Sequence, residues 1–159
     1  MTTPDDRRGR IARIAALPQE LAALVGNLSD EQLDARAPDD PWTARQVTHH
    51  VADSHINAFV RTKLILTEDH PTLKPYDQDA WAALADTQAM PVEVSLGLLR
   101  GLHARWVRIF ESLGPSEWGR GALHPESGEV TIDSMLESYA QHGDDHLAQI
   151  RRILAAQPS

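Results

Sequence analysis

Apolar side chains recur at spacings of three and four residues along four long segments of this chain, and almost no segment alternates as a half-buried strand would. The segments cover about residues 7–25, 43–67, 91–113 and 132–156. Such spacing puts the apolar residues on one face of an α-helix, and that face has to be buried against a partner. The pattern therefore predicts an all-α fold, a four-helix bundle with short connecting helices.

Capping signals mark where several of these helices begin. Thr43 and Gln46 form a capping-box pattern at the start of the second segment. Ser29 and Gln32 repeat the pattern and predict a short helix before it. Pro91 is typical of the first residue of a helix and opens the third segment.

Proline and glycine mark the interruptions. Pro18 lies inside the first segment and predicts a kink or a division there. Two prolines in residues 68–76 exclude a continuation of the second helix, and a short helix is expected over residues 78–84. Ser127 and Gly128 indicate a tight turn, typical of a small hairpin, before the last helix.

Length and charge limit what the chain can be. A chain of 159 residues is long enough to bury about 70% of its unfolded surface, so we expect one domain over residues 1–159. The net charge of −8 repels phosphate backbones and anionic lipids, which argues against nucleic-acid and membrane partners. We find no run of 18 apolar residues and no signal-peptide core at the N-terminus, and we therefore expect a cytoplasmic protein.

The chain has no cysteine, so disulfides, cysteine nucleophiles and thiolate metal sites are excluded. Any metal must be held by histidine and carboxylate side chains. Histidine is abundant, at positions 49, 50, 55, 70, 103, 124, 142 and 146.

The apolar line of the last helix has a gap that His142 and His146 fill, so both face the core one turn apart. Two imidazoles at this spacing can bind one divalent ion, as in the zinc-protease helix motif. Gly143 stands where that motif has its glutamate, which excludes a protease of that kind. The pair could instead pack half-buried with hydrogen bonds to its neighbours.

A stable metal site needs a third ligand from another helix. His50 shares the inward face of the second helix, whereas His49 and His55 fall off that line. Three neutral imidazoles leave one position open, as catalytic zinc sites do. Of the other histidines, His70 and His124 are expected in exposed loops, and His103 on the surface of a helix or partly packed.

Several stretches resemble the YfiT branch of the DinB-like superfamily, and together they cover nearly the whole chain from about Leu17. They include the Trp42-Thr43 start of the second helix and the two histidines of the last. The stretches are residues 41–55, 61–63, 71–77, 102–106, 124–126 and 139–150.

The resemblance implies a DinB-type four-helix bundle that forms a homodimer. It implies a divalent metal, zinc first and nickel as the alternative, held by His50, His142 and His146. His50 lies eight residues after Trp42, as the family pattern has it. Where relatives carry extra histidines between the last two ligands, this chain has residues 143–145, Gly-Asp-Asp.

The resemblance implies a metal-dependent hydrolase that activates water against a small-molecule substrate. We consider Asp53, His55 and Asp145 as candidates for its general base. The alternative is an S-transferase that uses a low-molecular-weight thiol of the bacillithiol type on electrophiles. A further alternative is a metal-binding dimer without catalysis. Fold alone does not choose among the three.

Overall fold

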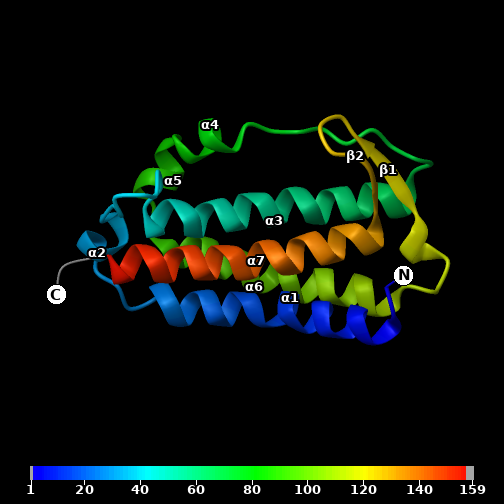
Figure 1. The fold of residues 1–159 in the computed structure, drawn as a ribbon, viewed down its shortest axis with the longest axis horizontal. Helices are drawn as coiled ribbons and strands as arrows, with labels where there is room; N and C mark the ends of the chain where they lie inside the picture. Colours follow the sequence, from blue (N-terminus) through cyan, green and yellow to red (C-terminus); the bar gives the residue numbers. More distant parts are fainter. Residues whose placement is uncertain (1, 157–159) are drawn as a thin grey trace.

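The computed structural model describes residues 2–156. Four long helices lie side by side in Figure 1: α1 (Pro4–Val25), α3 (Ala44–Thr67), α6 (Val92–Ser112) and α7 (Ile132–Ala155). Helix α1 packs on α6 and α7, and α3 packs on the same two helices from the other side. The prediction of an all-α four-helix bundle is confirmed.

Shorter elements join the long helices. The turn at Gly128, whose φ of 77° suits glycine, lies in the hairpin that the sequence indicated. Two short elements were missed, α5 and the 3-10 helix η1. The short elements are α2 (Asp30–Asp34), α4 (Gln78–Ala82), α5 (Ala85–Ala89), η1 (Glu117–Gly119), and the antiparallel strands β1 (Gly121–His124) and β2 (Gly128–Thr131).

Helix α1 is continuous through Pro18, so of the predicted kink or division, the division does not occur. The helix persists because residues on both sides of the proline, such as Leu17 and Leu21, are buried in the core. A proline inside a helix leaves the carbonyl four residues earlier without its usual amide partner. Here that carbonyl belongs to Ile14, and it receives another hydrogen bond, described below.

Helices α3 and α6 run in the same direction along the bundle, as Figure 1 shows. The chain must therefore return along the length of α3 before α6 can begin. Residues 68–91 make this return and carry α4 and α5. The return segment lies along α3 (Figure 1), and its Lys74 carbonyl accepts a hydrogen bond from Arg61 of α3, Nη2 to O, at 2.7 Å. A connection of this kind covers part of the bundle surface.

A layer of histidines divides the apolar core into two clusters. One cluster lies near the start of α3 and contains Val47, Val51, Leu96, Leu99, Leu147 and Ile150. The other lies toward the hairpin and contains Ile14, Phe59, Trp106, Phe110, Ile132 and Leu136. Buried or half-buried histidines from α3, α6 and α7 lie between them. The polar chemistry of the molecule is thus in the middle of the bundle.

Gly143 brings α7 close to α1. A Cβ at this position would lie 2.8 Å from Cδ2 of Leu17, closer than real Cβ atoms approach. Glycine inside a helix costs about 1 kcal/mol relative to alanine, and this close approach gives the residue a structural reason. The contact falls one residue after His142.

Ion pairs join the outer faces of α1 and α7. Arg7 binds Asp133 with two bonds, Nε to Oδ1 at 2.8 Å and Nη2 to Oδ2 at 3.1 Å. The hydrogen bonds from Arg7 lower the pKa of Asp133 below its ordinary value.

Among residues 2–156, no helix combines the length and the apolar character that crossing a membrane requires.

We predict that Asp133→Asn lowers the free energy of unfolding at pH 7 by about 1 kcal/mol, because it removes a bidentate ion pair that is only partly exposed. The pKa of Asp133 is depressed in the folded state, so its contribution is present above the unfolded pKa and lost as the pH falls through the folded pKa. Urea unfolding at pH 7 and at about pH 3 measures the difference. It should shrink at the lower pH, and the exposed Asp39→Asn should show no such change; a difference independent of pH would contradict the assignment.

Candidate metal centre

Three histidines meet where α3 packs against α7. His50 comes from the first half of α3, and His142 and His146 come from α7, which runs antiparallel to it. One nitrogen from each ring can be chosen so that all three lie within 4.8 Å of one another. The Nε2 atoms of His142 and His146 are 3.1 Å apart. The structure thus brings together the three histidines that the helical spacing selected.

The protein environment keeps these imidazoles neutral. His50 is 4% exposed, and burial, followed by the repulsion that a second protonated ring at His146 would cause, lowers its pKa to about 4. Burial also lowers the pKa of His142 to about 3, and it lowers that of His146. A neutral imidazole keeps one nitrogen lone pair, which is what a metal ion requires.

The orientation of His146 is set by a hydrogen-bond chain from the loop before α3. The carboxylate of Asp40 only accepts, so the Nε2 amide group of Gln149 donates to it at 3.0 and 2.9 Å. The Oε1 of Gln149 is therefore the acceptor for Nδ1–H of His146, at 2.7 Å. His146 consequently presents the lone pair of Nε2 to the other histidines, in the manner of metal ligands oriented by a neighbouring carbonyl or carboxylate.

The donor set fits a divalent metal of the zinc or nickel type. Neutral imidazole nitrogens suit both ions, and their mutual distances allow one ion to contact all three. Within the described residues, no fourth histidine, aspartate or glutamate joins the cluster. Trp42 lies against His50, with ring centroids 4.7 Å apart, and covers one side of the group.

A pocket of about 510 Å³ adjoins the cluster on the side of the return segment. His142 and Ser54 form its inner wall, and Tyr76 belongs to the return segment that covers it. Its walls also carry charges of both signs, from Arg61, Asp77 and Glu126, besides Pro75, Gln78, His124 and Tyr139. The pocket is large enough for a small molecule and is polar where it meets His142.

The three candidates for a general base lie in different environments. Asp53 is half-buried one turn after His50, and burial followed by repulsion from Asp86 raises its pKa to about 6. Asp145 is exposed and accepts a hydrogen bond from Nε2 of Gln141 at 2.8 Å. His55 is fully buried behind His142, and both of its ring nitrogens are hydrogen-bonded to other histidines.

His70 is exposed as predicted, but His124, expected in an exposed loop, and His103, expected on a helix surface or partly packed, are both buried. His103 is 2% exposed and faces α1, and His124 is 9% exposed at the end of β1. A signal for His103 was present in the sequence, because it continues the buried line of Leu99, Trp106 and Phe110 at helical spacing. For His124, the ring nitrogen Nδ1 accepts from the amides of residues 126 and 127 and so packs into the turn.

The chain is similar to known proteins over most of its length. A family model described as the DinB superfamily matches residues 13–150. A protein of Oceanobacillus iheyensis named "Putative metal-dependent hydrolase" is 46% identical over 143 residues, which is 90% of this chain and 83% of the relative. A Bacillus mycoides protein with the same description is 46% identical over 143 residues, 90% of this chain and 82% of the relative.

A solved structure has the same fold. YfiT from Bacillus subtilis, described as a probable metal-dependent hydrolase with an unusual four-helix bundle topology, superimposes with a TM-score of 0.93 at 36% sequence identity. The match covers 96% of this chain and 88% of YfiT. The likeness thus includes the whole bundle.

We predict that Gln149→Leu weakens zinc binding by about tenfold to a hundredfold, because His146 loses the acceptor that directs its Nε2 lone pair. Competition with a chromophoric chelator measures the dissociation constant. Gln141→Leu, on the exposed face of the same helix, is the matched control and should bind as the unaltered protein does. Equal dissociation constants for the two variants would refute the role of Gln149.

Proposed function

The chain belongs to the DinB superfamily, and on that basis we propose that it is a hydrolase that uses a divalent metal held by His50, His142 and His146. We propose zinc as the metal, with nickel as the alternative, because both suit a set of neutral imidazoles. One observation carries the proposal: three neutral ring nitrogens lie within 4.8 Å of one another beside a pocket of about 510 Å³. The names of the relatives support the same reaction class.

A metal bound by three imidazoles would lower the pKa of a water molecule toward about 7 and polarise the bond to be hydrolysed. The protein's own groups would then position the substrate. Arg61 and Tyr76 line the pocket together with His142. The bond from Arg61 to the Lys74 carbonyl ties the return segment to α3 and so fixes this wall.

We propose Asp53 as the proton acceptor. Asp53 lies three residues after His50, so helical geometry puts both on one face of α3. The other two candidates are less suitable, because His55 already uses both nitrogens and Asp145 is bound to Gln141 at the exposed surface of α7. A half-buried carboxylate with a raised pKa suits this task near neutral pH.

All the proposed ligands and pocket residues come from one helical bundle with its connections, which supports a single metal-binding domain over residues 1–159. The homodimer implied by the family resemblance stays a prediction. Sedimentation equilibrium of the purified protein tests it.

The proposed reaction predicts turnover of small aryl esters or amides by the zinc- or nickel-loaded protein without added thiol. After chelation the rate should fall to that of the uncatalysed reaction in buffer with chelator, and it should return when the metal is restored. His142→Ala removes one of the three ligands and should abolish the activity. Product absorbance measures these rates.

Two other outcomes would overturn the hydrolase. Turnover of an electrophile such as monochlorobimane only when a bacillithiol-type thiol is supplied would make the protein an S-transferase. Metal binding without turnover in either assay would make it a metal-binding protein without catalysis.

We predict that Asp53→Asn lowers kcat by about a hundredfold to ten-thousandfold and leaves the zinc dissociation constant unchanged, because it removes the proton acceptor and no ligand. Steady-state kinetics and chelator competition measure the two quantities. Asp145→Asn is the matched control and should retain the kcat of the unaltered protein. Equal kcat values for both variants would show that Asp53 is not the base.

A further inference from the structure

A row of three imidazoles connects the metal centre to the opposite side of the bundle. Nδ1 of His142 lies 3.2 Å from Nε2 of His55, and Nδ1 of His55 lies 3.0 Å from Nε2 of His103. The rings of His55 and His103 are within 8° of parallel. Nδ1 of His103 lies 2.6 Å from the backbone carbonyl of Ile14 in α1. The row crosses from α7 through α3 and α6 to α1.

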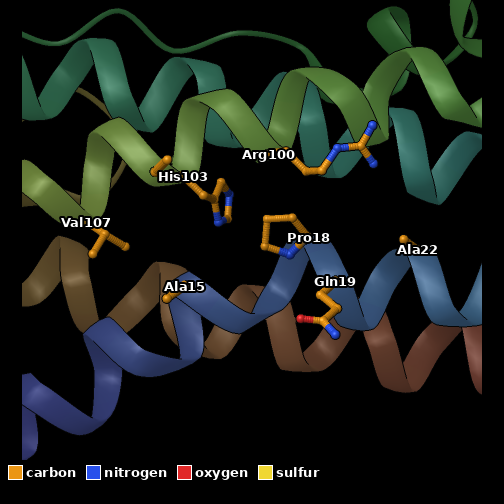
Figure 2. A pocket seen from close by; sticks show the side chains of 8 residues that line it. Ala15, Pro18, Gln19, Ala22, Arg100, His103 and Val107 are labelled. Carbon is orange, nitrogen blue, oxygen red and sulfur yellow. The ribbon is translucent and has the colours of Figure 1, made fainter.

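The end of this row depends on Pro18. The carbonyl of Ile14 would normally accept from the amide of residue 18, but proline has no N–H. The carbonyl of Ile14 is therefore available to another donor inside the core, and His103 uses it. Figure 2 shows Pro18 of α1 and His103 of α6 on facing helices, both lining a pocket between them.

A backbone carbonyl gives the row a direction. It can only accept, so Nδ1 of His103 carries the proton and Nε2 is left as an acceptor. Nδ1–H of His55 then donates to His103, which leaves Nε2 of His55 as an acceptor. Nδ1–H of His142 donates in turn to His55, and the lone pair of His142 is placed on Nε2.

We propose that the Ile14 carbonyl, released by Pro18, fixes the tautomers of His103, His55 and His142 so that His142 offers Nε2 to the metal. In this proposal, which rests on the proposed metal site, His55 and His103 are positioning residues. They touch neither substrate nor metal and act through His142. Proline in the middle of α1 thereby acquires a role in metal binding.

The second ligand of α7 agrees with this assignment. Gln149 and Asp40 direct the Nε2 lone pair of His146 toward His142. With both tautomers fixed, two Nε2 lone pairs face each other at 3.1 Å with no proton between them. A cation between the two nitrogens resolves this arrangement, and a hydrogen bond between neutral rings does not. Two independent hydrogen-bond networks thus direct imidazole lone pairs to the same point, where a metal ion would bind.

His103→Leu tests the proposal at a distance from the ligands. Without the acceptor at position 103, Nδ1–H of His55 would be buried without a partner. His55 should then adopt the Nε2–H tautomer and donate to Nδ1 of His142, which moves the proton of His142 to Nε2. We expect the zinc dissociation constant to rise about tenfold or more.

The tautomers themselves are read from long-range proton–nitrogen correlation spectra of the metal-free protein labelled with nitrogen-15 histidine. His55, His103 and His142 should all be Nδ1–H in the unaltered protein, and His55 and His142 should switch to Nε2–H in the His103→Leu variant. This readout needs neither metal nor activity, so it stays informative even if the hydrolase proposal fails. An Nε2–H form of any of the three in the unaltered protein would overturn the proposal.

Two further variants separate positioning from folding. His103→Gln keeps one donor and one acceptor and should restore zinc binding to within about threefold of the unaltered protein. Pro18→Ala supplies an amide that competes for the Ile14 carbonyl, and it should weaken zinc binding without lowering the melting temperature. Unchanged zinc binding in both His103→Leu and Pro18→Ala would overturn the proposal.

His49→Leu is the matched control for the loss of a buried histidine. His49 is 6% exposed and bonds Ser95 and the Met90 carbonyl, away from the row. Its substitution should lower the melting temperature and leave the zinc dissociation constant unchanged. If His49→Leu weakened zinc binding as much as His103→Leu, the effect would be general destabilisation and the proposal would fail.

Discussion

Imidazoles placed in the middle of a helical bundle must each find partners for two nitrogens, since an unpaired buried nitrogen is costly. Much of this molecule is arranged around that requirement. The core is split into two apolar clusters by the histidine layer. Each nitrogen along the row from His142 to His103 has a partner, and the row ends on a carbonyl that only accepts. Under the proposed tautomers, the Nε2 atoms of His142 and His146 face each other at 3.1 Å without a proton between them.

The topology of the bundle decides what surrounds that contact. Because α3 and α6 run in parallel, residues 68–91 have to return along α3, and their Tyr76 borders the pocket beside His142. The hairpin at the other end contributes His124 at the pocket rim. Connections required by the fold thus line part of the pocket beside His142. The bundle carries the proposed ligands and Arg61, and the connections add the charged residues Asp77 and Glu126 to the pocket lining.

Much of this arrangement could be predicted from the sequence. Helical periodicity gave the four long helices, and the same periodicity placed His50, His142 and His146 on facing surfaces. The hydrogen bond between His103 and the Ile14 carbonyl could not be predicted in the same way. Pro18 shows that this carbonyl lacks its usual amide donor, but it does not show which donor replaces the amide. That donor, His103, is 89 residues away in the chain. Contacts at such separation depend on which helices are neighbours, which local spacing does not specify.

Gly143 lies next to His142, a proposed ligand, and packs closely against Leu17 of α1. The position of His142 therefore depends on the size of the side chain at position 17. Leu17 occupies the space that any larger residue at position 143 would need. A larger residue at position 143 would require the end of the Leu17 side chain to move, a smaller residue at position 17, or a shift of α7 together with the adjacent His142. The proposed metal site therefore depends on a leucine that is not among its proposed ligands, and positions 17 and 143 are expected to vary together.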